Sequence, residues 1–197
     1  MNNEPTYEAI VIGTSAGGLA ALFSILRILP SNYFIPIIIV QHRAKDPKDL
    51  LEEVLQSKCM IKIEQANEKE SILAGKVYLA PPDYHLLIES DRSFSLSSDE
   101  PVQYSRPSID VLFESASLAY HSKLIGIVLT GANSDGSMGL TAIQKSGGFV
   151  IVQDPEEAMF QAMPTAAIKA TNTDHIWSLT AIQNFLLTIH AANEKRD

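Results

Sequence analysis

The 197-residue sequence contains a single cysteine, Cys59. One cysteine excludes an internal disulfide and a zinc site built from several thiolates. Basic residues are also scarce: 15 Lys and Arg stand against 23 Asp and Glu, for a formal net charge of -8. A balance of this sign argues against a surface that neutralises nucleic-acid phosphates. We therefore expect no nucleic-acid partner.

The sequence also lacks a long hydrophobic run. The longest aliphatic stretches, such as residues 37–40 (IIIV), are far shorter than a membrane-spanning helix. Residues 1–5 (MNNEP) contain no basic residue and are followed by no apolar run, so they are not a signal peptide. These absences predict a cytoplasmic protein that does not insert into a membrane.

The composition is that of a globular protein. Hydrophobic residues make up 46% and charged residues 19% of the chain. A chain of this length buries roughly 70% of the surface that its unfolded form exposes, so it needs no disulfide for stability. No repeat, low-complexity tract or linker divides the sequence, and we expect a single domain over residues 1–197.

Short apolar runs alternate with segments of helical periodicity. The pattern predicts strands at 8–13, 35–41, 60–64, 76–80, 124–130 and 149–153, and helices at 17–29, 46–57, 107–120, 135–146, 164–170 and 180–193. Residues 84–89 and 93–97 flank a turn and predict an antiparallel hairpin. The alternation predicts a doubly wound α/β fold, with a mostly parallel sheet, helices on both faces and the hairpin at one margin.

Three helix boundaries have local signals. Asp46-Pro47 is typical of an N-cap followed by proline at the first helical position. Gly147-Gly148 predicts the end of the helix at 135–146. Thr180 and Gln183 have the spacing of a capping box at the start of the last helix.

Chemically active side chains follow three of the predicted buried strands. Ser15 follows the first strand, His42 the second, and Asp135 the strand at 124–130. Loops at the carboxyl ends of parallel strands meet at one edge of the sheet. A serine nucleophile requires a histidine base and a carboxylate that orients the base. The three residues are therefore a candidate catalytic triad.

The loop after the first strand, Gly13 to Gly17, matches G-x-S-x-G, a pattern of sharp strand-to-helix turns that expose a serine hydroxyl. A glycine-rich turn at this place is also typical of a dinucleotide site. The loop lacks the full G-x-G-x-x-G spacing, however, and residues 33–45 contain no acidic residue before Asp46 to bind a ribose. These departures favour the hydrolase hypothesis.

The same residues allow other interpretations. The chain order of common α/β-hydrolases, serine then acid then histidine, would require His175 or His190, although His190 fits a surface position on the last helix. His42 taken alone also fits a structural residue at a strand end, and Asp135 taken alone fits a helix N-cap. Their shared position after core strands favours the catalytic interpretation.

Several segments together resemble one family. They are IVIGTSAGG, PIIIVQHR, VYLAPPDYHLLIE, SRPSIDVLFESAS, IGIVLTGANSDGSMGL and GGFVIVQDPEEAMFQAMPTAA, spread over residues 8–190. In this order they resemble the catalytic domain of the chemotaxis protein-glutamate methylesterases, the CheB family. The resemblance places the family's catalytic residues on Ser15, His42 and Asp135, in agreement with the triad derived from strand positions.

The resemblance implies a serine hydrolase, without metal or cofactor, that demethylates glutamate γ-methyl esters on methyl-accepting chemotaxis receptors and also deamidates receptor glutamines. The family usually has Thr after the serine, where this chain has Ala16, and Met where it has Ala132. The amides of Ala16 and Ala132 are the expected oxyanion donors. The family's usual receiver domain does not fit in the seven residues before Glu8, so activity independent of phosphodonors is expected.

Two rival functions remain: an esterase or amidase with another substrate, and a non-catalytic binding module. Of the remaining motif residues, Arg106 is interpreted as a structural ion-pair partner rather than a substrate ligand, and His85 and Cys59 as structural. Met159 and Met163 belong to a loop interpreted as packing, with a place beside the cleft as the alternative.

Overall fold

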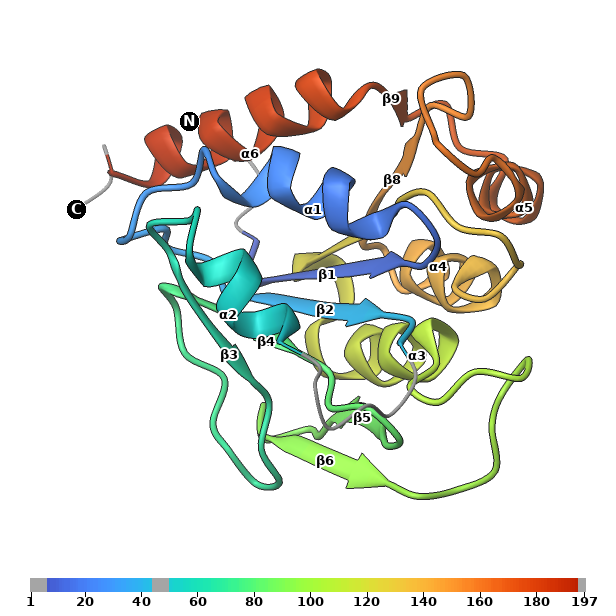
Figure 1. Ribbon diagram of the computed structural model, residues 1–197, viewed down its shortest axis with the longest axis horizontal. Helices are drawn as coiled ribbons and strands as arrows, with labels where there is room; N and C mark the ends of the chain where they lie inside the picture. The colour runs from blue at the N-terminus through green and yellow to red at the C-terminus, as the bar shows by residue number, and fades with distance from the viewer. Residues whose placement is uncertain (1–6, 44–49, 195–197) are drawn as a thin grey trace.

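The computed structural model describes residues 7–43 and 50–194. Its centre is a seven-stranded parallel sheet with the order β3-β4-β2-β1-β7-β8-β9 (Figure 1). The strands are β1 (Ala9–Thr14), β2 (Ile37–Gln41), β3 (Lys62–Gln65), β4 (Lys76–Leu79), β7 (Leu124–Val128), β8 (Phe149–Gln153) and β9 (Ile176–Trp177).

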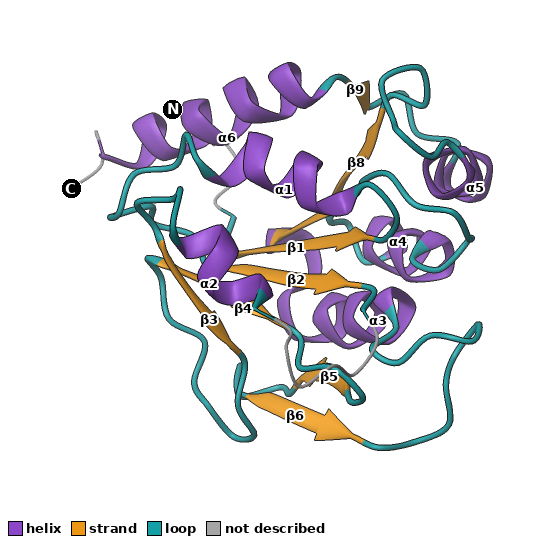
Figure 2. Cartoon of the chain, in the orientation of Figure 1, coloured by secondary structure: helices purple, strands orange, loops and turns teal. Residues whose placement is uncertain are grey.

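Helices cover both faces of the sheet (Figure 2). One face carries α1 (Gly18–Leu26), α2 (Leu51–Gln56) and α6 (Leu179–Glu194); the other carries α3 (Ile109–Tyr120), α4 (Ser137–Lys145) and α5 (Ala162–Thr171). Successive residues of a strand point to opposite faces. Ile10 and Ile12 accordingly pack in the α1–α6 core, whereas Val11 packs in the α3–α4 core.

The predicted hairpin forms a separate two-stranded antiparallel sheet of β5 (His85–Ile88) and β6 (Phe94–Ser97). It packs on α3: Leu86 and Phe94 share a core with that helix, and the Ile88 N–H donates to Ser115 Oγ at 3.1 Å. The predicted fold class, a mostly parallel α/β sheet with helices on both faces and an antiparallel hairpin, is confirmed.

The last third of the chain corrects three predictions. Strand β9 was not expected. Ser178, not Thr180, accepts the hydrogen bond at the start of α6, from the Ala181 N–H at 3.1 Å, so the capping-box prediction is wrong. The surface interpretation of His190 is also wrong, because this residue is only 7% exposed and stacks on Tyr33 with ring centroids 5.2 Å apart.

Two further boundary signals have different outcomes. The Gly148 N–H donates to Ile143 O at 2.9 Å, and Gly147 has a φ of +85°, so the two glycines end α4 as predicted. The Asp46-Pro47 signal lies outside the described residues.

Strand β1 lies at the point where the order of the sheet reverses. From β1 the chain goes first to β2 and β4 on one side, and later to β7 and β8 on the other. In such sheets the crevice outside the carboxyl ends of the strands, at the reversal, is the usual binding site. The three loops that follow β1, β2 and β7 therefore border the expected binding crevice.

Candidate active site

Backbone pairing places Ser15 and His42 side by side. Thr14 and Gln41 are register partners at the ends of β1 and β2, and the two candidate residues follow them directly. The His42 N–H donates to Thr14 O at 3.0 Å, and the Ser15 N–H donates to Thr130 O at 3.0 Å. These bonds join the ends of β1, β2 and β7 at the reversal of the sheet.

The serine loop is held in one conformation. Ser15 O accepts from Gln41 Nε2 at 3.0 Å and from the Gly18 N–H at 2.9 Å. Because a peptide unit is planar and trans, these contacts turn the Ala16 N–H away from Gln41. Gly17 has a φ of +78°, and a Cβ there would lie 2.8 Å from Met159 Cβ, so the turn requires glycine.

Asp135 is fully buried, and both of its carboxylate oxygens accept hydrogen bonds. Oδ2 accepts from His42 Nε2 at 2.8 Å and from the Ile109 N–H at 2.7 Å. Oδ1 accepts from Ser108 Oγ at 2.9 Å and from the N–H groups of Asp110 and Gly136, each at 3.0 Å. The carboxylate therefore lies at the amino terminus of α3, where free N–H groups and the helix dipole favour negative charge.

These contacts determine the charge of Asp135. Burial by itself would raise its pKa, but the hydrogen bonds from His42 and from the backbone of Asp110 and Ile109 outweigh burial, and the pKa lies below its ordinary value. The carboxylate is ionised at neutral pH. Asp135 thus is not the N-cap of the following helix, where Gly136 stands instead.

A second buried carboxyl group lies beside the first. Asp110 accepts from the Gly139 N–H at 2.7 Å and from Gln103 Nε2 at 2.7 Å. Burial raises its pKa to about 6, the Gly139 bond opposes that rise, and the charge on Asp135 adds to it. Two adjacent carboxyl groups thus have pKa values that move in opposite directions, and only Asp135 contacts the imidazole.

The His42 ring is oriented by that contact. An ionised carboxylate only accepts hydrogen bonds, so the 2.8 Å contact puts a proton on Nε2. The other ring nitrogen, Nδ1, lies 3.4 Å from Asn133 Nδ2. Nδ1 is therefore the ring atom left to act as a base.

Ser15 and His42 face two neighbouring hollows of the surface. Ser15 lines one of about 480 Å³ with Leu19 and Phe23 of α1. His42 lines another of about 490 Å³ with Tyr104 and Arg106. The Ser15 hydroxyl makes no hydrogen bond to any residue in the described part of the chain. Long or absent nucleophile–base bonds are common in enzymes without substrate.

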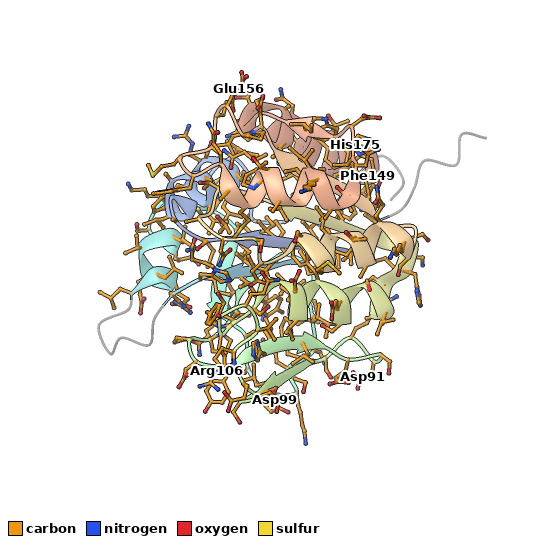
Figure 3. The ribbon with its side chains drawn as sticks, turned by 90° about the vertical axis from the view of Figure 1, so that its right-hand side faces the viewer. Asp91, Asp99, Arg106, Phe149, Glu156 and His175 are labelled. Carbon is orange, nitrogen blue, oxygen red and sulfur yellow. The ribbon has the colours of Figure 1, made fainter. Side chains whose placement is uncertain are left out.

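The remaining residues singled out in the sequence have structural contacts. Arg106 pairs with Asp83 at 2.6 Å, and His85 Nδ1 accepts the N–H of Ser108 at 3.2 Å. His175 is beside Phe149 at a ring distance of 4.3 Å, far from Arg106 (Figure 3). The serine–acid–histidine order that would use His175 is therefore not supported.

The two methionines differ: Met159 lies in the loop before α5, and Met163 lies in the first turn of that helix. Met163 is fully buried in the core, whereas Met159 is 69% exposed and covers Gly17 next to the serine. The packing interpretation therefore fits Met163, and the alternative beside the cleft fits Met159. Cys59 is buried, as expected of a packing residue.

Sequence reasoning missed three residues of the site: Gln41, Ser108 and Asn133. Gln41 Nε2 joins the carbonyl oxygens of Ser15 and His42, at 3.0 and 2.9 Å. Ser108 is the N-cap of α3, and serine is a residue type common at that position, but no local pattern shows that this helix end receives Asp135. Asn133 lies two positions before Asp135, but no sequence pattern marks it as a residue of the site.

Within residues 7–43 and 50–194, no group of three or more His, Cys, Asp or Glu side chains gathers as metal ligands would. No helix in that part of the chain is long and apolar enough to cross a bilayer.

Comparisons with known proteins show the family to which the chain belongs. A sequence profile of the CheB methylesterase family matches residues 10–186. A relative from Leptospira interrogans is 52% identical over 187 residues, which cover 95% of this chain and 97% of the relative. A relative from Trichodesmium erythraeum, named protein-glutamate methylesterase/protein-glutamine glutaminase, is 34% identical; the matched region is 89% of this chain and 51% of the relative.

A solved structure supports the same assignment. The chain superposes on the crystal structure of the Thermotoga maritima CheB methylesterase catalytic domain with a TM-score of 0.88 at 30% identity, covering 93% of this chain and 99% of that one. A likeness of this extent shows the same fold.

Proposed function

The chain belongs to the CheB methylesterase family, a family of carboxylic ester hydrolases, and we propose that it hydrolyses glutamate γ-methyl esters through Ser15, His42 and Asp135. The observation that carries the proposal is the hydrogen bond of 2.8 Å between the buried, ionised Asp135 and His42 Nε2. His42 itself lies on the loop next to Ser15. A carboxylate with five donors, one of them an imidazole beside a serine, has the arrangement of a triad acid.

The reaction follows from the donor and acceptor roles. His42 Nδ1 takes the hydroxyl proton as Ser15 Oγ attacks the ester carbonyl carbon. The protonated ring then gives that proton to the departing methoxy group, so methanol leaves and an acyl-serine remains. Water attacks the acyl-serine with His42 again taking the proton, and Ser15 is restored as the free carboxylic acid forms. Asp135 stabilises the charged ring in both halves.

The oxyanion of each tetrahedral intermediate requires N–H donors fixed before the reaction. We assign the Ala16 N–H, whose orientation is set by the contacts of Ser15 O, and the Ala132 N–H on the loop after β7. Neither N–H makes a hydrogen bond to another described residue. Ala16 O is held by Thr130 Oγ1 at 3.0 Å, which also restrains this loop.

We propose as substrate the glutamate methyl ester of methyl-accepting chemotaxis receptors, in the cytoplasm, a choice that family membership supports. The same acyl chemistry with ammonia as leaving group would deamidate receptor glutamines, an activity that the name of the Trichodesmium relative includes. The hollow beside Ser15, with Leu19 and Phe23 on its wall, offers an apolar surface to a receptor helix.

The test compares substrates. Methanol release is measured from a folded, methylated receptor fragment, from unfolded peptides that carry the same methyl esters, and from small acyl esters. The proposal predicts that the folded receptor gives the highest kcat/KM. Faster turnover of unrelated esters would support an esterase with another substrate, and no turnover of any ester would support a binding module.

A further inference from the structure

We propose that Asn133 is a positioning residue of this site: its carboxamide donates to His42 Nδ1 and holds the ring neutral in the resting enzyme. The inference rests on the proposed function, because it concerns the atom that acts there as the base. It starts from two contacts of one side chain. Asn133 Oδ1 accepts the Asp135 N–H at 3.2 Å, and Asn133 Nδ2 lies 3.4 Å from His42 Nδ1.

The orientation of the amide follows from chemistry. The Asp135 N–H is a donor, so the Asn133 atom that meets it must be the carbonyl oxygen. The amide nitrogen is then the atom that faces His42, and it can only donate. His42 Nδ1 must therefore present its lone pair, which is possible only when the ring is neutral with its proton on Nε2. The contact with Asp135 Oδ2 requires the same tautomer, so the two neighbours of the ring agree.

The two neighbours differ in their effect on the charged ring. Asp135 favours protonation of His42, because its carboxylate is ionised and 2.8 Å away. Asn133 opposes protonation, because a protonated Nδ1 would bring two donors together. The other charged groups near the ring are Arg43, next to it in the chain, and Arg106 and Asp83 across the hollow that His42 lines. Asp110 lies behind Asp135 and makes no contact with the ring.

The position of Asn133 has a consequence for the reaction. The lone pair that receives the Ser15 proton is the one that Asn133 occupies at rest, while the Ser15 hydroxyl has no hydrogen bond to the described residues. Ser15 therefore takes the place of Asn133 at Nδ1 when substrate is bound. Asn133 therefore keeps the lone pair of Nδ1 unprotonated, and the base competent, until the hydroxyl replaces it.

The first test separates this contact from the role of Asn133 in the turn. In Asn133→Ser the hydroxyl can still accept the Asp135 N–H but is too short to reach the ring. We expect the titration midpoint of the His42 ring nitrogens, followed by NMR, to rise by about 0.5 pH unit, the lower part of the range for one neutral hydrogen bond. The acid limb of kcat/KM for ester hydrolysis should move by the same amount.

The second test uses Asn133→Asp, which has the same shape. One oxygen keeps the bond to the Asp135 N–H, and the other replaces the amide donor with an acceptor. The midpoint should rise further than in Asn133→Ser, because the acceptor and its charge both favour the protonated ring. Ser134→Ala is the matched control: Ser134 is on the same loop, but its hydroxyl bonds Gln103 at 2.8 Å, and no shift is expected.

The outcomes distinguish this inference from the proposed function. Unchanged midpoints in both Asn133 variants, each with a cooperative thermal melt, would overturn the role of Asn133 and leave the esterase proposal intact. A wild-type protein that hydrolyses no ester would overturn the proposed function, while the ring titration would still report on the contact. A shift as large in Ser134→Ala would show that loop disturbance alone explains the effect, and would also overturn the inference.

Discussion

Asp135→Asn replaces one carboxylate oxygen with an NH2 group at the most heavily bonded side chain of the site. If the NH2 takes the place of Oδ1, it meets the N–H groups of Asp110 and Gly136. If it takes the place of Oδ2, it meets one backbone donor, the Ile109 N–H, and the His42 ring. The second arrangement loses fewer backbone bonds, so we expect it to form.

That arrangement has two measurable effects. The buried Ile109 N–H is left without an acceptor, which costs about 1–3 kcal/mol. For a domain of this size the cost lowers Tm by roughly 2–12 °C. The His42 ring can bond the new NH2 only by turning Nε2 into the acceptor, which moves the proton to Nδ1. The base atom is then blocked, and triads in the wrong tautomer lose about 10⁴ in kcat.

The assay measures initial rates of methanol release together with thermal unfolding, on wild type and Asp135→Asn. Ser108→Ala is the comparison, because it removes one donor to Oδ1 at 2.9 Å and leaves the carboxylate in place. It should cost about 1 kcal/mol of stability but less than about tenfold in rate, or about 1.4 kcal/mol. A rate for Asp135→Asn within about tenfold of wild type, or a Tm above wild type, would refute the reasoning.

Three further predictions follow from the same contacts. Gln41→Leu should lower kcat by about 10- to 100-fold, because it frees the carbonyl oxygens of Ser15 and His42; an unchanged kcat in a folded variant would contradict this. The pKa of Asp135 is lowered, so the stability that its ionised form contributes is complete above its unfolded pKa near 3.9 and is lost as pH falls through the folded value. The free energy of unfolding in urea should therefore fall more for wild type than for Asp135→Asn over that pH range. The pKa of Asp110 is raised to about 6, so its ionisation costs stability as pH rises from about 4 to 6. The free energy of unfolding of Asp110→Asn relative to wild type should therefore increase by about 1–2 kcal/mol between pH 4.5 and 7.5. A difference that stays constant over this range would contradict the raised pKa.

The centre of the sheet was predictable because β1, β2 and β7 are buried on both faces. Residues 37–40 are apolar at every position, and each one is fully buried in the structure. A parallel strand between two helix layers has this pattern, which allows the strand and its loop to be located together. The candidate triad could be proposed for the same reason, since each member lies on the loop that follows such a strand.

The supporting contacts were not predictable, because they join residues distant in sequence. The amino terminus of α3 receives Asp135 across 25 to 27 positions, and Gln41 reaches Ser15 across 26. The hydrophobic periodicity of the sequence does not predict contacts between residues so far apart. Strand β9 was missed for another reason: its two residues are too few to show an alternating pattern.

The burial of His190 shows a related limit. Its neighbours on α6, such as Thr188 and Ala191, are not strongly apolar, so the sequence favoured a surface position. In the fold, Tyr33 from the segment after α1 stacks on its ring. The partner that buries this histidine comes from a part of the chain that a local window does not include.

The most direct test of the central claim is the rate of methanol release from a methylated receptor fragment by Ser15→Ala. A matched control is Ser57→Ala, whose exposed hydroxyl bonds Val54 O at 2.8 Å on α2. If Ser15 is the nucleophile of the Ser15–His42–Asp135 triad, the first variant should lose at least about 10³-fold in kcat with an unchanged Tm, and the second should match wild type. A Ser15→Ala rate within about tenfold of wild type would contradict the assignment of the nucleophile.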